Sequence, residues 1–246
     1  ERDAIARRHA VHLLGILNKD TTVGESAYAV HDHVGNVHAA LNWTFSDAGD
    51  TSLGAALAAA AVPIFMDLSL LTECHRQAAI ALDALDDGAR GTRLEMHLQA
   101  ALGVSSMFVY GNSPEAFTAL TRCLALTDEL DDPSQQLVVL GALHLSLYRR
   151  GDLRGALAIA RRGERVARRL ADPGAHSLVD WMIGSSLHLI GDQTAAETRL
   201  RSALVPQPSS KRMAMASFFL IRIRSLVLLA RTRWLVGRAE EAIRVA

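Results

Sequence analysis

The stretch GDLRGALAIARRGERVARRLADPGAHSLVDWMIGSSLHLIGDQ, residues 151–193, opens with a Gly-Asp dipeptide that returns at its far end. Forty residues separate Gly151 from Gly191, and the same interval leads back from Gly151 to Gly111. Asp-Pro dipeptides also recur at this interval. A fixed period of this length is typical of supersecondary units that stack on their neighbours. The spacing therefore predicts an array of helix pairs, an architecture that more often holds a partner than catalyses a reaction.

Helical periodicity extends through nearly the whole chain, and no stretch alternates like a strand. Each turn glycine can adopt the left-handed conformation that ends a helix, and an Asp or Asn after it can cap the next. Asp50 is expected to cap a helix that Pro63 then interrupts. The pattern predicts an all-α fold. Its helices are expected at about residues 2–18, 26–46, 50–67, 70–86, 92–110, 114–130, 134–150, 153–170, 174–190, 193–204 and 211–236, with a last partner after residue 237.

Composition excludes several classes of protein. Hydrophobic residues make up 50% of the 246-residue chain and charged residues 21%, which is not typical of a disordered segment. Cys74 and Cys123 stand outside any CxxC motif and indicate reduced thiols. The most apolar stretch, Met213 to Leu235, contains four arginines, so it does not resemble a membrane span. With no signal peptide at its start, the chain is expected to be cytoplasmic, without a membrane partner.

Charge is divided unevenly along the chain. Residues 1–125 carry 8 basic and 14 acidic side chains, whereas residues 126–246 carry 18 and 12. Such an asymmetry can steer a partner or a neighbouring domain, although it also arises by simple variation along a helical array. The chain starts at Glu1 and stops within an expected helix, so we expect it to be a fragment of a longer protein.

The helix pairs resemble tetratricopeptide repeats. In that family a small residue lies seven positions before the turn glycine and an alanine five after it, where the two helices cross. The copies around residues 111, 151 and 237 keep the alanine, whereas His144 occupies a normally small position and the units are longer than the usual 34 residues or so. The resemblance implies a right-handed α-solenoid of antiparallel helix pairs. The copy that matches best has Gly184, Leu187, Gly191, Ala196, Leu200, Ala203 and Pro208 at the family's offsets.

The front of the chain carries a second resemblance. The run NVHAALNW at residues 36–43, followed by Gly49-Asp50 and an alanine-rich helix, is similar to the junction where helical repeats begin in one class of bacterial transcriptional regulators. These are ATP-dependent regulators of the signal-transducing NTPase class, with a winged-helix or similar DNA-binding domain. The resemblance implies that residues 1–49 are leading helices linked to an upstream ATPase region. Residues 50–246 would then form the repeat array, with its last repeat truncated.

Catalytic, cofactor and metal motifs are not evident. A phosphate-binding loop needs a lysine after a glycine-rich turn, and neither Lys19 nor Lys211 has that context. The histidines at residues 31, 33 and 38 lack the spacing of a zinc site and are interpreted as solvated or hydrogen-bonded. No nucleophile motif accompanies a histidine. We therefore expect no enzyme activity, no cofactor and no metal in this chain.

The segment 153–170 is rich in arginine. Arg161, Arg165 and Arg168 share one side of the expected helix, which would suit contact with phosphates. No aromatic residues interleave for stacking on bases, however, and outer helices of solenoids are commonly charged. We favour a solvated face or a docking patch within the parent protein, and expect no direct nucleic-acid binding.

The resemblance to tetratricopeptide repeats also implies a candidate binding groove, lined by the first helix of each pair. Aromatic anchors beside an arginine and hydroxyls would suit a peptide or a small ligand. Trp181 and Trp234 could instead fill the core between repeats. Carried onto this sequence, the family's groove positions are Ser105, Phe108, Leu145, Tyr148, Arg149, Trp181, Ser185, His188, Arg231 and Trp234.

The function expected from this reasoning is that of a non-catalytic sensor or interaction domain of a bacterial transcriptional regulator. The groove would bind a small-molecule effector or a protein partner, and binding would shift the arrangement of the ATPase and DNA-binding domains. The alternative is a plain protein–protein scaffold or oligomerisation module with no small-molecule effector.

Overall fold

The computed structural model describes residues 1–18, 34–205 and 215–246, with side chains of the last segment described from residue 221. Every regular element in these ranges is a helix, which confirms the predicted all-α fold. Several sequence expectations lie outside the described residues. They are the helix beginnings at 26–33 and 211–214, the break at 206–210 with Pro208, the lysines at 19 and 211, and His31 and His33.

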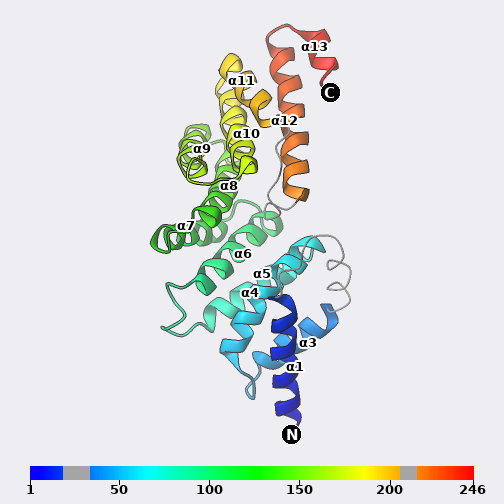
Figure 1. The fold of residues 1–246 in the computed structure, drawn as a ribbon, viewed down its shortest axis with the longest axis vertical. Coiled ribbons are helices and arrows are strands. Elements are labelled where there is room, and N and C mark those ends of the chain that lie inside the picture. The colour runs from blue at the N-terminus through cyan, green and yellow to red at the C-terminus, as the bar shows by residue number, and fades with distance from the viewer. Residues whose placement is uncertain (19–33, 206–214) are drawn as a thin grey trace. The chain divides into compact units, whose positions relative to one another are not determined.

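The chain divides into two compact units, Glu1–Leu130 and Asp131–Ala246, called unit 1 and unit 2 below. Unit 1 contains α1 (Arg2–Leu17), α3 (Val34–Thr44), α4 (Thr51–Asp67), α5 (Leu71–Asp83), α6 (Arg93–Val109) and α7 (Pro114–Glu129) (Figure 1). Unit 2 contains α8 (Pro133–Arg149), α9 (Leu153–Ala167), α10 (Pro173–Ile190), α11 (Gln193–Ala203), α12 (Met215–Leu235) and α13 (Ala239–Ile243).

The turns between paired helices follow the predicted chemistry. Gly111, Gly151, Gly191 and Gly237 all have positive φ, between 74° and 100°, where a side chain would be strained. At the start of α4, α9 and α11, the side chain of the N-cap Asp accepts a hydrogen bond from the backbone N–H three residues later. The prediction for α7 is wrong in detail, because Ser113 rather than Asn112 caps the helix. The reason is that Pro114 occupies its first position and leaves Ser113 at the N-cap.

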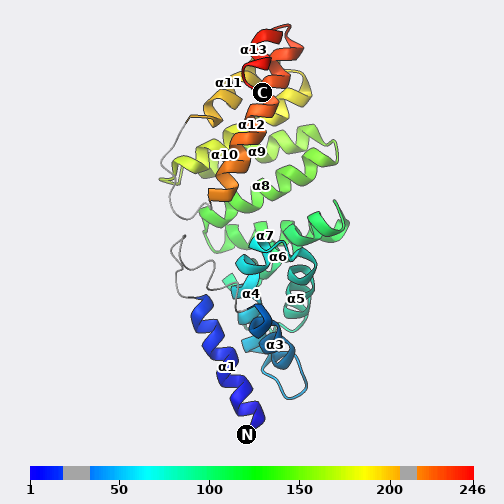
Figure 2. The same ribbon diagram turned by 90° about the vertical axis from the view of Figure 1, so that its right-hand side faces the viewer.

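Unit 1 has its core where the leading helices meet the first pair. α1 packs against α3 and α4, and Figure 2 shows it flanking them. Leu13, Leu41, Leu57 and Phe65 are almost completely buried there. Pro63 lies on an exposed side of α4, and the helix continues past it to Asp67. The leading helices thus belong to the same compact unit as the helix pairs that follow.

The two helices of a pair approach closely at a glycine. A Cβ added at Gly103 of α6 would lie 2.7 Å from Leu120 Cγ of α7, and one at Gly184 of α10 would lie 2.8 Å from Leu200 Cγ of α11. Both glycines therefore make room for the leucine of the partner helix. The same contact in two pairs agrees with the predicted repeat.

In unit 2, α10 is surrounded by its neighbours. It packs against α8 and α9 of the preceding pair, its own partner α11, and α12 of the next pair. α12 runs alongside α10, with α9 on the opposite side of α10 (Figure 1). Few side chains of α10 can therefore reach solvent.

Candidate binding surface

The ten residues predicted to line one groove are divided between the two units. Ser105 and Phe108 belong to α6 of unit 1, and the other eight belong to α8, α10 and α12 of unit 2. Phe108 is exposed, with 48% of its surface accessible. The single row of groove residues therefore stays a prediction, and the site is built below within unit 2.

Two of the predicted hydroxyls do not face a groove. Ser105 and Ser185 are fully buried. Ser105 Oγ donates to the carbonyl of Ala101 at 2.6 Å, and Ser185 Oγ donates to that of Met182 at 3.0 Å. Each hydroxyl is satisfied one turn back on its own helix, because neighbouring helices cover that side of α6 and α10. Their prediction as groove residues is corrected accordingly.

The two tryptophans have opposite environments. Trp181 is 6% exposed and belongs to the core, whereas Trp234 is 61% exposed. The rings of His144 and Trp181 pack edge to face at a centroid distance of 5.4 Å. The structure thereby answers the open question for each residue: Trp181 packs between helices, and Trp234 is at the surface.

The outer side of Trp181 is covered by an arginine of the next helix pair. The guanidinium carbon of Arg224, on α12, lies 5.5 Å from the centroid of the Trp181 ring, within the range of a cation–π interaction. Arg224 is half-buried, and this burial, together with the positive charge of Arg149 on α8, lowers the pKa of its guanidinium. Tyr148 and Leu145 lie half-exposed on α8 beside Arg149. Leu145, Tyr148, Arg149, Trp181 and Arg224 are called the Arg224 face below.

Beneath this face lies a buried histidine. Ser186 Oγ donates to the carbonyl of Met182 at 2.9 Å and lies 3.0 Å from His144 Nε2, so it accepts the proton of that nitrogen. His144 Nδ1 is then an acceptor, and it has no hydrogen-bond partner among the described residues. Burial lowers the pKa of His144 to about 4. The residue that departs from the repeat pattern is therefore a neutral histidine linking α8 to α10.

Three other predicted residues meet at the end of unit 2. His188, Arg231 and Trp234 line a pocket of about 380 Å³, together with apolar residues of α12 and α13. His188 is 7% exposed, and its Nδ1 lies 2.9 Å from Thr232 Oγ1 and 3.0 Å from Gln193 Oε1. Burial lowers the pKa of His188, although the contact with Gln193 opposes this. Sequence reasoning thus found residues of two separate places, the Arg224 face and this C-terminal pocket.

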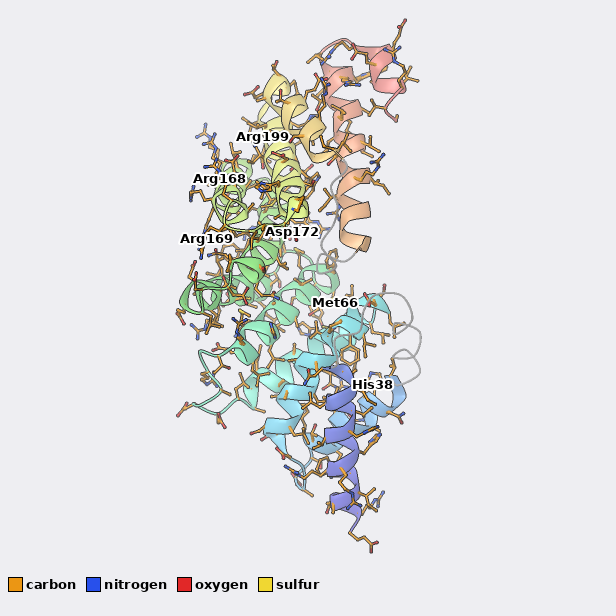
Figure 3. The ribbon with its side chains drawn as sticks, in the orientation of Figure 1. His38, Met66, Arg168, Arg169, Asp172 and Arg199 are labelled. Atoms are coloured by element: carbon orange, nitrogen blue, oxygen red, sulfur yellow. The ribbon has the colours of Figure 1, made fainter. Side chains whose placement is uncertain are left out.

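Arg168 and Arg169, in the arginine-rich segment 153–170, lie on the side of unit 2 away from α12 (Figure 3). Arg168 lies 3.7 Å from Glu164, and Arg169 lies 2.5 Å from Asp131. Arg199, on α11, contacts Asp180 at 2.9 Å and Glu164 at 3.0 Å. These guanidinium groups therefore have carboxylate partners.

Arg224 is a residue of the Arg224 face that the sequence pattern did not single out. A signal was present, because Arg224 lies seven residues before the predicted groove residue Arg231. Seven residues are two helical turns, so both fall on one side of α12.

No group of three or more histidine, cysteine, aspartate or glutamate side chains could hold a metal ion in the ranges that the structure describes. Within the same ranges, every helix is too short or too polar to cross a membrane.

Comparison with known proteins gives a structural neighbour. No family model matches the sequence, and no curated protein matches it. Among solved structures, the chain is similar to BtubC (BKLC) from P. vanneervenii, with a TM-score of 0.62 and 16% sequence identity. The match covers 87% of this chain and 96% of BtubC. At this identity the similarity concerns the fold alone.

Proposed function

We propose that the chain is a non-catalytic ligand-binding module, a right-handed tetratricopeptide-like solenoid that serves as the sensor domain of a bacterial transcriptional regulator. The Arg224 face is the binding surface in this proposal. Binding there would bias the regulator's ATPase and DNA-binding domains in the cytoplasm between two arrangements.

The observation that carries the binding role is the Arg224 face itself. It combines a half-exposed tyrosine, a leucine and two arginines from helices of different pairs. Aromatic and arginine side chains are the residues on which binding energy concentrates. A change in the packing of α8, α10 and α12 would also be felt at this face, since Trp181 and Arg224 bridge α10 and α12.

The regulator part of the proposal rests on the run at residues 36–43 and the elements after it. A P-loop encoded elsewhere in the same polypeptide would support it. A parent protein with no nucleotide-binding motif would remove the regulator and leave only the binding module.

A thermal-shift screen tests the binding role. Metabolites and peptides are screened against the whole chain and against Tyr148→Ala, with the exposed Tyr110→Ala of unit 1 as the matched control. We expect a ligand that raises the melting temperature of the wild type and of Tyr110→Ala but not of Tyr148→Ala. A ligand whose effect survives Tyr148→Ala unchanged would place binding elsewhere.

The C-terminal pocket favours the second candidate, a protein scaffold without an effector. Trp234, Leu235 and Ile243 are 61–71% exposed around its mostly apolar lining. Exposed apolar patches of this kind mark protein contacts. Capture of a protein partner that Trp234→Ala abolishes and Tyr148→Ala preserves would select the scaffold.

A further inference from the structure

We propose that Arg224 binds the oxyanion of an anionic ligand, a carboxylate or a phosphate group, while Trp181 holds the guanidinium in place. This inference deepens the proposed function, on which it rests, by naming the chemistry of the ligand.

The first observation is that Arg224 has no counter-charge among the described residues. Among the described residues, no carboxylate forms an ion pair with Arg224, whose described contacts are the Trp181 ring and the nearby charge of Arg149. The undescribed segment of unit 2, residues 206–214, contains no aspartate or glutamate. Unit 2 as a whole has 18 arginines and lysines against 10 aspartates and glutamates. No acidic group of unit 2 is therefore placed to neutralise Arg224.

The second step is that three half-buried acidic groups of unit 2 are paired with other arginines. Glu164 and Asp180 contact Arg199, and Glu197 contacts both Arg233 and Arg238. The other buried or half-buried arginines on α11 and α12 thus have the carboxylate that Arg224 lacks. A half-buried guanidinium loses hydration, and a second positive charge nearby adds repulsion. An anion bound at Arg224 would reduce both costs at once.

The third step is the preorganisation of the guanidinium. The cation–π contact with Trp181 restrains the guanidinium group of Arg224, which carries a planar fork of N–H donors. A planar fork of donors matches the two oxygens of a carboxylate or of a phosphate. Trp181 is itself immobilised, since His144 packs against it and it is almost completely buried.

Two buried polar atoms, one on Trp181 and one on the residue after Arg224, lack hydrogen-bond partners in the described part of the chain. Ser225 follows Arg224 on α12 and is fully buried, and Trp181 is 6% exposed. Neither Ser225 Oγ nor Trp181 Nε1 has a hydrogen-bond partner among the described residues. Both groups can donate a hydrogen bond. Buried donors without partners are rare in proteins, and Trp181 Nε1 belongs to the ring that contacts Arg224.

The test uses isothermal titration of the whole chain with two probes at low ionic strength, inorganic phosphate and a peptide of three glutamates blocked at both ends. We expect saturable binding of at least one probe by the wild type. Arg224→Gln should weaken it about tenfold or more, because a charge-assisted hydrogen bond is lost. Arg224→Lys should recover only part of the affinity, since lysine keeps the charge and loses the fork. Arg168→Gln, on the opposite side of unit 2, should bind like the wild type.

The pattern of results separates the sources of the anion. Binding of phosphate alone assigns a phosphate group, binding of the peptide alone assigns a carboxylate, and binding of both supports the shared chemistry. If neither probe binds, or if Arg168→Gln loses as much affinity as Arg224→Gln, the proposal is overturned. The proposed function fails separately: a screened ligand that Tyr148→Ala abolishes and Arg224→Gln leaves unaffected would refute the anion site and keep the binding module.

Discussion

The two sides of α10 in unit 2 hold their arginines in opposite ways. On the side of α9 and α11, Arg199 lies between two carboxylates, those of Asp180 and Glu164. On the side of α12, Arg224 lies on the ring of Trp181 with Arg149 as its charged neighbour. The charge of Arg199 is compensated by carboxylates of the same unit. The charge of Arg224 has no carboxylate partner among the described residues and is available to a bound anion. Two arginines of the same unit can thus have different roles.

The arginine-rich segment 153–170 contains guanidinium groups that are paired within the fold. The segment 153–170 attracted attention because its arginines are numerous, yet Arg168 and Arg169 contact Glu164 and Asp131. Arg224 is less conspicuous in the sequence, yet it is half-buried and has no carboxylate partner among the described residues.

The largest expected effect comes from removing the aromatic ring under Arg224. Trp181→Ala should lower the free energy of unfolding by about 3–5 kcal/mol, because it leaves a cavity between α8, α10 and α12. Urea denaturation measures the loss. Trp234→Ala is the matched control, and its exposed ring should cost less than about 1 kcal/mol. Equal losses in the two variants would show that Trp181 contributes no more to stability than an exposed tryptophan does.

The next effect is a dependence on pH. His144 stays neutral in the folded chain because its pKa is lowered to about 4, whereas an unfolded histidine titrates near 6.5. Between these values the unfolded chain binds more protons than the folded one, so stability falls as the pH falls through this window. From pH 7 to pH 5, the wild type should lose about 1–2 kcal/mol more than His144→Gln does.

Unfolding in urea at the two pH values measures this difference. The control is His176→Gln, which changes an exposed histidine of the neighbouring helix α10 and should keep the pH dependence of the wild type. If His144→Gln retains the full loss between pH 7 and pH 5, the dependence arises from other groups.

The smallest effect tests the two arginines directly. Arg199→Gln should destabilise the chain by about 1 kcal/mol, because Asp180 loses its charged partner and solvent screens part of the effect. Arg224→Gln should change stability by less than about 0.5 kcal/mol, since the lost cation–π contact is offset by relief from burial and from Arg149. Thermal and urea unfolding of both variants measures the contrast. A larger loss for Arg224→Gln than for Arg199→Gln would reverse the comparison.

Much of the fold was predictable because its determinants are local. The glycines in the turns predict positive φ angles, and Asp50, Asp152 and Asp192 predict the caps of α4, α9 and α11. The exception was also local, since Ser113 lies next to the expected cap Asn112 and takes its place. Such features depend on a few consecutive residues, and the sequence displays them directly.

The candidate site was only partly predictable. Counting from the turn glycines found Tyr148, Arg149 and Trp181, which share the Arg224 face, and also Ser105 and Ser185, which are buried. A helical period places residues on one side of a helix but does not say what covers that side. For α10 this limit is severe, because four neighbouring helices pack around it.

What the sequence determined by itself was therefore the repeat: helices of nearly known length, the turns between them, and the small residues where paired helices cross. Each of these follows from backbone conformation and hydrogen bonding over a few residues. What only the tertiary structure decided was which side chains the stacking buries, and that Arg224 meets Trp181, 43 positions earlier, instead of a carboxylate. The physical reason is that burial and charge compensation depend on surfaces from helices far apart in the chain, whose meeting no local pattern records.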